Sequence, residues 1–218
     1  MEEAQLREII KDFIEQLELL LKEQVKDLPK TEPLPLMNVG PLTKRAMIEI
    51  VSHEGIVLEA YKDSVGVWTW GIGVTDASGH SVGRYKDNPQ SIAKVVEIYK
   101  WLLETKYLPP VLRAFKGHKL TENQLAAAVS FHYNTGAIEK ASWVKTFLAG
   151  HKAIAKQQFM NYRRPPEIIE RRKKERDLFF DGTWSNDGMV TVYTKVNKPS
   201  YTPNWKSAKR IDITKELA

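Results

Sequence analysis

Apolar residues in the first part of the chain recur at the spacing of one helix face. Leu6, Ile10, Phe13, Leu17 and Leu20 follow one another at intervals of 4-3-4-3, and neither Gly nor Pro interrupts the run. The pattern predicts an amphipathic helix over residues 1–27. Prolines and a glycine crowd the next stretch, a composition that predicts an extended linker over residues 28–41.

Over the next thirty or so residues, the spacing of the apolar residues changes from that of a helix to that of two successive strands. Thr43 is a suitable N-cap for an apolar helix that ends at Glu54, because Gly55 favours the left-handed turn that stops a helix. Alternation over residues 57–63 then predicts a strand, and the β-branched and aromatic residues 67–70 predict its return. A three-residue turn would place Tyr61 opposite Thr69, with Asp63 as the diagonal neighbour of Thr69.

Most of the remaining pattern is helical. Ser91 is expected to cap a long helix that stops before Pro109, and a capping box at Thr121 is expected to begin a very apolar helix. A later helix should end at Gly182, a residue typical of the position after a helix. Residues 189–196 alternate as a strand, and the aromatic content of the tail predicts that it folds against the domain.

Composition narrows the class of protein. The chain has 218 residues with 42% apolar content, enough for one substantial domain with appendages. It contains no cysteine, which excludes disulfides and thiolate metal sites. No apolar run approaches the length of a membrane span. The acidic start, Met1-Glu2-Glu3, predicts that the chain has no Sec export signal.

The net charge of +6 is unevenly distributed. Residues 1–27 hold eight acidic and four basic residues, a charge of −4, so the rest of the chain carries +10. A basic body favours polyanions such as peptidoglycan with its acidic polymers, membrane surfaces or nucleic acid. We expect no nucleic-acid partner, because no nucleic-acid-binding motif accompanies the charge.

The predicted hairpin gathers groups that suit glycoside hydrolysis. That reaction needs one carboxyl that gives a proton to the leaving oxygen and one that stays ionised. Glu54 suits the first role, because a helix C-terminus disfavours a charged carboxylate, and Asp63 suits the second as a solvent-facing turn residue. On spacing alone, a surface Glu and a turn Asp are the more common interpretation.

The residues around this pair resemble a known family. Glu54, Asp63 and Thr69, within H-E-G, Y-K-D and W-T-W-G-I-G, resemble the Glu/Asp/Thr triad of phage-type lysozymes, glycoside hydrolase family 24. The segments S-F-H-Y-N-T-G at 130–136, R-R-K-K-E-R-D-L-F at 171–179 and G-T-W at 182–184 resemble later family motifs in the same order. The resemblance covers roughly residues 41–184. Val74 departs from it, since many relatives carry His there.

The resemblance implies an α+β, lysozyme-like fold in which a small hairpin lobe and a larger helical lobe flank a cleft. It implies a muramidase in which Glu54 is the general acid, Asp63 and Thr69 orient water, and the anomer is inverted. Asn134 and Arg171 become candidates for substrate binding, and no metal or cofactor is implied. Two alternatives remain for these binding residues: a helix C-cap amide for Asn134, and a solvated helix face for Arg171 and Arg172.

Two other functions remain compatible with the sequence. A lytic transglycosylase would use Glu54 alone, and a wall-binding or assembly protein could keep the scaffold without turnover. The domain division is residues 1–27, 28–41, 42–184 as the lysozyme domain, and 185–218 as a C-terminal extension. Residues 2–27 could pack on the domain, self-associate or dock on another protein. We expect synthesis in the host cytoplasm and action on the cell wall, in phage lysis or as a virion component.

Overall fold

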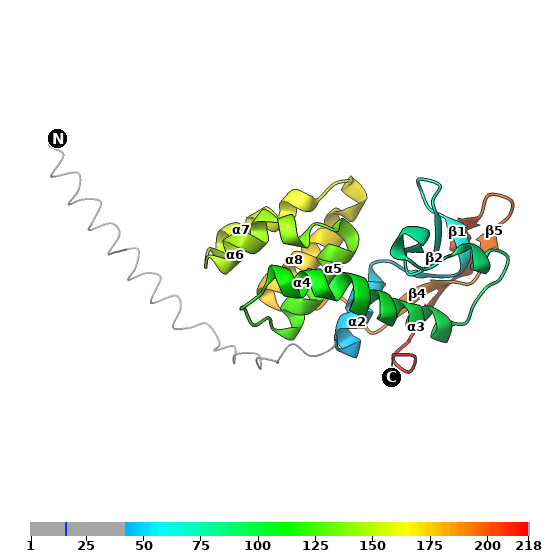
Figure 1. The fold of residues 1–218 in the computed structure, drawn as a ribbon, viewed down its shortest axis with the longest axis horizontal. Helices are drawn as coiled ribbons and strands as arrows, with labels where there is room; N and C mark the ends of the chain where they lie inside the picture. The colour runs from blue at the N-terminus through cyan, green and yellow to red at the C-terminus, as the bar shows by residue number, and fades with distance from the viewer. Residues whose placement is uncertain (1–15, 17–41, 218) are drawn as a thin grey trace. The chain divides into compact units, whose positions relative to one another are not determined.

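The computed structural model of the chain describes residue 16 and residues 42–217 (Figure 1). The helix expected over residues 1–27 and the linker expected over residues 28–41 lie outside the described residues, apart from Gln16. Residues 42–217 fall within one compact unit that combines a small sheet with a set of helices. This is the α+β class that the sequence predicts.

Helices make up most of this unit, which consists of a helical lobe and a smaller lobe that contains the sheet (Figure 1). One lobe contains α4 to α8, and α3 runs from it to the sheet. The bounds are α2 Lys44–Ser52, α3 Ile92–Leu102, α4 Leu108–Ala114, α5 Glu122–Thr135, α6 Ser142–Leu148, α7 Lys152–Phe159 and α8 Ile169–Asp181. Short turns are η1 Asp76–Ser78, η2 Gly83–Tyr85, η3 Leu103–Tyr107, η4 Ile138–Lys140, η5 Met160–Tyr162, η6 Pro166–Ile168 and η7 Trp205–Ser207.

The expected caps are present at the ends of these helices. The side chains of Thr43, Ser91 and Thr121 each accept a backbone N–H of the helix that follows. Thr121 also forms the expected capping box with Gln124. Gly182 ends α8 with φ 72°, in the left-handed conformation that a glycine adopts without a Cβ penalty. Local side-chain chemistry therefore sets these helix boundaries.

The α-helix that begins at Ile92 ends at Leu102, before Pro109 as expected, but the chain stays helical beyond it. It passes through the π turn η3 and resumes as α4, which ends at Ala114. Pro109 and Pro110 lie in the first turn of α4, where a missing N–H costs least. The π turn absorbs the break, with the Leu108 N–H donating to the Leu103 carbonyl.

The main sheet has the strand order β3-β2-β1-β4-β7. Its strands are β1 Ile56–Lys62, β2 Trp68–Gly71, β3 Val74–Thr75, β4 Val190–Tyr193 and β7 Ala208–Ile211. The first two form the predicted antiparallel hairpin, in which Tyr61 pairs with Thr69 as expected. The N–H of Asp63 donates to the carbonyl of Val67 at 3.0 Å, which closes the loop over Ser64 to Gly66.

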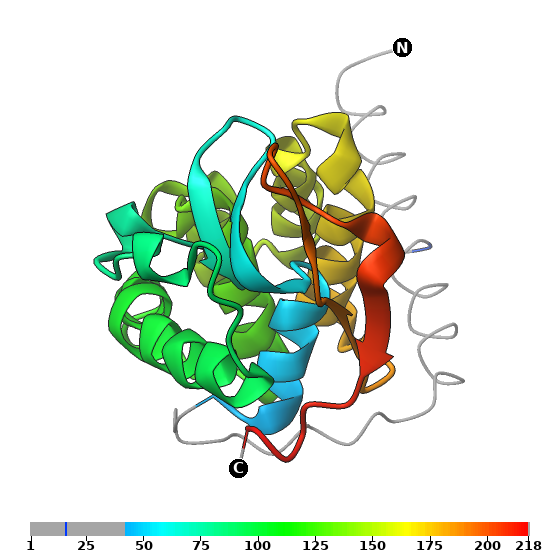
Figure 2. The same cartoon turned by 90° about the vertical axis from the view of Figure 1, so that its right-hand side faces the viewer.

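The C-terminal extension completes this sheet. β4 pairs in parallel with β1, and β7 pairs antiparallel with β4, so both continue the sheet beyond the hairpin (Figure 2). A second pair, β5 Val196–Asn197 and β6 Thr202–Pro203, forms its own two-stranded sheet next to β1, where the N–H of Lys62 donates to the carbonyl of Tyr201 at 2.7 Å. Ile213 and Leu217 are buried in the same hydrophobic core as the helices. The tail therefore folds against the domain, as its composition predicts.

The core of the helical lobe is an aromatic cluster around α5. Trp143 is fully buried and its ring lies 4.9 Å from that of Phe179 and 5.3 Å from that of Phe131. Phe159 packs 4.7 Å from Trp143. Such close edge-on packing fixes α5 against α8, the two helices that supply polar residues to the site below. Within the part of the chain that the structure describes, no helix has the length and apolar character to cross a membrane.

Candidate active site

Glu54 lies at the junction of α2 and β1. Its N–H donates to the carbonyl of Val51 at 3.0 Å, and the chain then turns at Gly55, whose φ is +75°. A Cβ at Gly55 would lie 3.3 Å from the ring of Tyr193, so glycine permits both the turn and the close approach of β4. The carboxyl of Glu54 is thus held where the helical lobe meets the sheet.

The carboxyl of Glu54 forms an ion pair with Arg171. Arg171 Nη1 donates to Glu54 Oε1 at 2.5 Å, and the two side chains are 10% and 21% exposed. No residue in the described part of the chain donates a hydrogen bond to Oε2. Arg171 therefore holds this carboxyl and does not lie on a solvated helix face.

Arg171 is itself fixed by α5 and α8. Its Nε donates to Glu175 Oε1 at 2.9 Å, and its Nη2 donates to the carbonyl of Ser130 at 3.2 Å. Burial acts to lower the pKa of Arg171, but the charges of Glu54 and Glu175 outweigh it and raise the pKa. Arg171 is therefore a permanently charged link between the two lobes.

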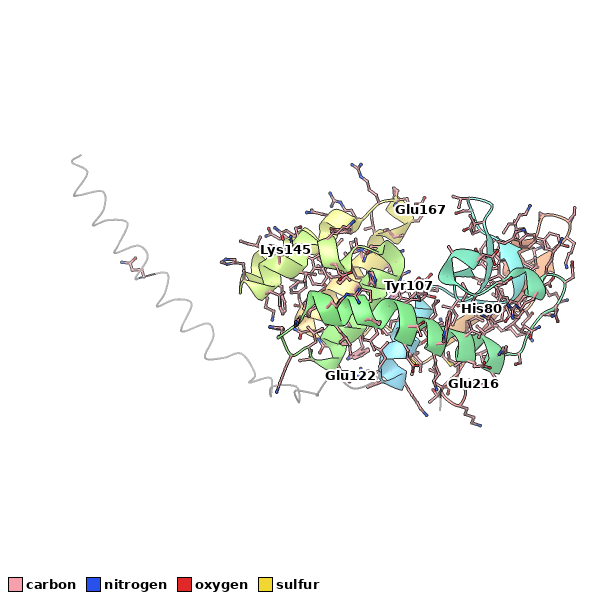
Figure 3. The ribbon with its side chains drawn as sticks, viewed as in Figure 1. His80, Tyr107, Glu122, Lys145, Glu167 and Glu216 are labelled. Carbon is pink, nitrogen blue, oxygen red and sulfur yellow. The ribbon has the colours of Figure 1, made fainter. Side chains whose placement is uncertain are left out.

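Four tyrosines lie near enough to Glu54 to feel its charge, and only Tyr61 among them was placed by the sequence. Burial raises the pKa of Tyr61, Tyr99, Tyr107 and Tyr133, and the negative charge of Glu54 raises each further. Tyr107, labelled in Figure 3, lies in η3 with its ring 4.3 Å from that of Tyr133. The phenols stay protonated and give Glu54 a largely apolar wall with hydroxyl groups at its edge.

Asp63 and Thr69 both form hydrogen bonds with the backbone of Val67. Asp63 Oδ1 accepts the N–H groups of Val65 and Val67 at 3.0 and 2.9 Å, and Thr69 Oγ1 donates to the Val67 carbonyl at 3.1 Å. Oδ2 accepts no hydrogen bond from the described residues. The pKa of Tyr61 is raised by burial and then by the charges of both Glu54 and Asp63, so both carboxylates act on one phenol.

Asn134 does not cap its helix. The C-cap residue of α5 is Gly136, whose N–H donates to the carbonyl of His132, so the capping alternative for Asn134 is wrong. Asn134 is exposed, and its Oδ1 accepts a hydrogen bond from Arg172 Nη2 at 2.5 Å. That bond orients the amide so that Nδ2 is the donor left for a ligand.

Arg172 is buried rather than part of a solvated helix face, so that expectation was wrong for it. Its side chain is fully buried, with the guanidinium 4.7 Å from the centre of the Phe131 ring. It donates to Glu175 and to the carbonyl of Tyr162. The planar guanidinium can stack on a ring and make several hydrogen bonds at once, which allows a cation in this position.

Glu175 joins the two arginines and is a functional candidate that the sequence analysis missed. It is 1% exposed, and it accepts hydrogen bonds from Arg171, Arg172 and the hydroxyl of Ser130, the last at 2.6 Å. The signal was present, because Glu175 follows the two arginines by the three- and four-residue spacing of helical ion pairs. This buried network connects Glu54 to Asn134 across 80 residues of sequence.

His53, the residue before Glu54, is buried without a hydrogen bond. Its side chain is 7% exposed, and Nε2 has no hydrogen-bond partner within the described residues, with Glu49 3.7 Å away. Burial lowers the pKa of His53 from 6.5 to about 3, and the charges of Arg171, Lys174 and Arg172 lower it in the same direction. His53 is therefore neutral in the folded protein at neutral pH.

The neutral state of His53 should make folding sensitive to acid. The unfolded chain takes up a proton at this residue near pH 6.5, whereas the folded chain does so only near pH 3, so stability falls as pH drops through that window. We expect a loss of about 2 kcal/mol from this residue between about pH 7 and pH 5. Urea denaturation at both pH values, on wild type and His53→Leu, measures it. The same pH dependence in both proteins would contradict the assignment.

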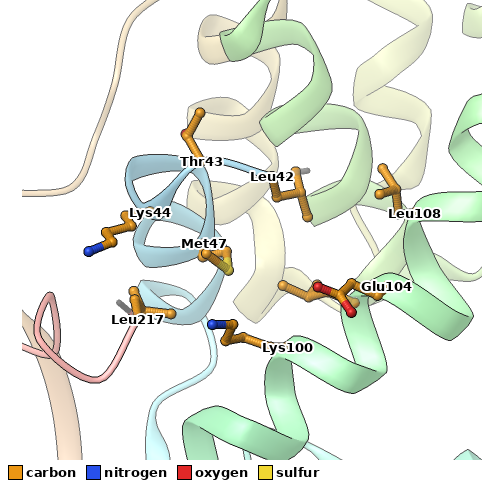
Figure 4. Close-up of a pocket in the computed structure, with 9 residues that line it drawn as sticks. Leu42, Thr43, Lys44, Met47, Lys100, Glu104, Leu108 and Leu217 are labelled. Atoms are coloured by element: carbon orange, nitrogen blue, oxygen red, sulfur yellow. The ribbon is translucent and has the colours of Figure 1, made fainter. Parts of the chain in front are cut away.

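A separate hollow of about 400 Å³ lies beside the start of α2 (Figure 4). Its lining is mainly apolar: Leu42, Thr43, Lys44, Met47, Lys100, Leu103, Glu104, Leu108 and Leu217. None of the candidate catalytic residues lines it, so we do not place the chemistry there. In the described residues, no group of three or more His, Asp or Glu side chains could hold a metal ion.

Comparison with known proteins identifies the family that the chain resembles in sequence. A sequence model of the family described as "Phage lysozyme" matches residues 51–175, a range that contains all five candidate residues. The chain is similar to an endolysin of Bacillus phage PZA, with 28% identity over 180 residues that cover 76% of this chain and 63% of that protein. The chain thus spans less than two thirds of the length of this curated relative.

Solved structures show the same fold. An endolysin from Escherichia coli O157:H7 phage FAHEc1 matches at a TM-score of 0.60 and 24% identity, over 68% of this chain and 99% of that one. A mutant of P22 lysozyme matches at 0.53 and 23% identity, over 65% and 99%. These likenesses establish the fold that the sequence resemblance implies, a small sheet lobe beside a larger helical lobe. The tail beyond residue 184 lies outside the family match.

Proposed function

Because the chain belongs to the phage lysozyme family, we propose that it is a muramidase that hydrolyses the β-1,4 bond between N-acetylmuramic acid and N-acetylglucosamine in bacterial peptidoglycan. One observation supports this most strongly. Glu54 lies just before β1 and Asp63 just after it, and each keeps one carboxylate oxygen without a hydrogen bond from the described residues. Two carboxyl groups with free oxygens beside one hairpin are the minimum that glycoside hydrolysis requires.

Glu54 is the general acid of this proposal. Arg171 holds Oε1, which leaves Oε2 as the oxygen that carries the proton to the leaving group. Arg171 thus positions the acid.

Asp63 and Thr69 orient the attacking water. Two backbone N–H groups donate to Asp63 Oδ1, which leaves Oδ2 as the base that takes one proton from the water. Thr69 donates its hydroxyl proton to the carbonyl of Val67, so its lone pairs are directed away from that bond and can accept a hydrogen bond from the other O–H of the water, which stays on the product. Attack from this side of the sugar, opposite the acid, inverts the anomer.

Asn134 and Arg171 have different roles at the sugar. Asn134 Nδ2 is the donor that would bind a sugar oxygen, since Arg172 occupies Oδ1. Arg171 is 10% exposed and already contacts Glu54, Glu175 and Ser130, so its contribution to the substrate acts through Glu54.

Product analysis separates hydrolysis from the transglycosylase alternative. Hydrolysis adds water to the new reducing end, whereas internal cyclisation does not, so the two products differ by about 18 Da. We expect mass spectrometry of muropeptides released from purified peptidoglycan to show the hydrated product. An anhydro product would favour the transglycosylase. No release of muropeptides by the wild type would favour a wall-binding or assembly protein.

The proposal also covers where the enzyme acts and what the segments outside the lysozyme domain do. The enzyme acts on the bacterial cell wall in phage lysis or as a virion component, with residues 42–184 as the lysozyme domain and 185–218 as its extension. Residues 2–27 would self-associate, dock on another protein or pack on the domain. Sedimentation of the full chain, compared with a chain that begins at Leu42, separates self-association from the other two.

A further inference from the structure

The C-terminal extension contains a hollow of about 370 Å³ whose lining includes three lysines. We call it the lysine hollow, and its lining residues are Thr194, Lys195, Asn204, Lys206, Ser207, Ala208 and Lys209. Three of these seven are cations, three are neutral hydrogen-bonding residues, and none is acidic. All lie outside the family match at residues 51–175. The proposed catalytic site uses none of them.

The three lysines Lys195, Lys206 and Lys209 form no ion pair with a carboxylate among the residues that the structure describes. Two neighbouring cations of the extension do: Lys198 pairs with Glu59 and Asp87, and Arg210 pairs with Asp187. The cations that line the hollow are therefore available for an anion.

The backbone that carries the lysines is held rigidly. Asn204 caps η7 by accepting the N–H of Lys206 at 3.1 Å, and its own N–H donates to the carbonyl of Lys195 at 3.0 Å. Ser207 Oγ accepts the N–H of Lys195 at 3.2 Å, and Lys209 pairs with Val192 in the sheet. These bonds fix the three Cα positions relative to one another, so less backbone ordering is required when a ligand binds.

An aromatic path connects the hollow to the catalytic region. Trp205, the neighbour of Lys206 in η7, is 67% exposed, and its ring lies edge-on to Tyr193 at 5.1 Å. The ring of Tyr193 in turn lies against Gly55, the residue after Glu54. A ligand in the hollow would therefore lie two side chains away from the backbone of the proposed acid.

We propose that the lysine hollow binds the phosphates of phosphodiester-linked, hydroxyl-bearing polymers that are attached to the wall glycan. The three ammonium groups can each pair with a phosphate, and Thr194, Asn204 and Ser207 can hydrogen-bond hydroxyl groups of the same polymer. The choice of wall polymer rests on the proposed function, which places the protein at the wall. Nucleic acid is less well matched, because single-stranded binders stack several bases on successive aromatic rings, and only Trp205 is exposed here.

The test uses two triple variants with the same change in charge. Lys195→Gln/Lys206→Gln/Lys209→Gln removes the cations of the hollow. The matched control, Lys116→Gln/Lys119→Gln/Lys152→Gln, removes three exposed lysines outside the extension. Binding of poly(glycerol phosphate) is titrated by calorimetry at low salt, after circular dichroism has established that both variants are folded. We expect the hollow variant to bind about tenfold more weakly and the control to change by less than about twofold.

Three results would overturn the proposal. These are equal losses in both variants, no loss in the hollow variant, and wild-type binding to DNA or to anionic lipid vesicles as tight as to the polymer. Binding is measured with soluble polymer that has no glycosidic bond to cleave. If the wild type binds the polymer but releases nothing from peptidoglycan, the muramidase proposal fails and the anion site remains.

Discussion

Replacing Glu54 with Gln should lower kcat/KM on purified peptidoglycan by about 1000-fold. Gln cannot deliver a proton to the leaving oxygen, but its side-chain oxygen can still accept the hydrogen bond from Arg171 Nη1 that Glu54 Oε1 accepts at 2.5 Å. The variant should therefore keep its fold while losing the chemical step. Release of reducing sugars, measured alongside thermal unfolding, separates the two effects. A variant that retains a tenth of wild-type activity would contradict the role of Glu54.

The control for this substitution is a second glutamate that pairs with an arginine. Glu139 accepts two hydrogen bonds from Arg113 at 2.9 and 3.3 Å, but lies on the surface with its side chain 48% exposed. Glu139→Gln removes the same charge and the same kind of ion pair, and should leave activity unchanged. Asp63→Asn adds the second half of the test. A hydrolase should lose activity with it as well, whereas a transglycosylase that uses Glu54 alone should not.

The parts of the site that could be predicted from the sequence are set by local signals. Gly55 stops the helix, the alternation of residues 57–63 makes a strand, and loop length fixes the pairing of Tyr61 with Thr69. Each signal spans fewer than about ten residues, within the reach of a hairpin. The positions of Glu54 and Asp63 on either side of β1 follow from them.

The environment of Glu54 depends on residues distant in sequence, so periodicity could not give it. Arg171 is 117 residues from Glu54 in the sequence. A run of arginines and lysines on a helix normally predicts a face exposed to solvent. The aromatic cluster around α5 draws α8 inward, and Arg171 and Arg172 turn with it toward the core. The burial of these arginines could be predicted only if their buried partner, Glu175, were recognised first.

The sequence also could not predict which strand of the sheet the C-terminal extension would join. The alternation of residues 189–196 indicates a strand but does not choose its neighbour, because a parallel strand can join any open edge. The structure pairs Val192 with Ile56, and the absence of a Cβ at Gly55 permits that approach. The π turn could not be predicted either, because proline usually ends a helix, whereas here Pro109 and Pro110 lie in the first turn of the next helix.

Replacing Glu175 with Gln should destabilise the folded protein by about 3–5 kcal/mol. The carboxylate is fully buried and is the shared partner of two guanidinium groups. Arg171 keeps Glu54 as a second partner, but Arg172 is fully buried and has no other carboxylate among the described residues. A neutral amide therefore leaves a buried cation uncompensated, which is the costly case for a buried ion pair.

Urea denaturation at neutral pH measures this cost, and Glu170→Gln provides the comparison on the same helix. Glu170 pairs with Lys173 at 2.7 Å, with side chains 75% and 47% exposed, so its loss should cost less than about 0.5 kcal/mol. Similar values for the two variants would mean that water reaches the arginines and compensates them. A large difference, accompanied by reduced turnover in the Glu175 variant, would place the stability of the helical lobe and the positioning of Glu54 in one buried network. Stability and activity are then coupled, because the arginine that orients the acid is held by the carboxylate that anchors α8.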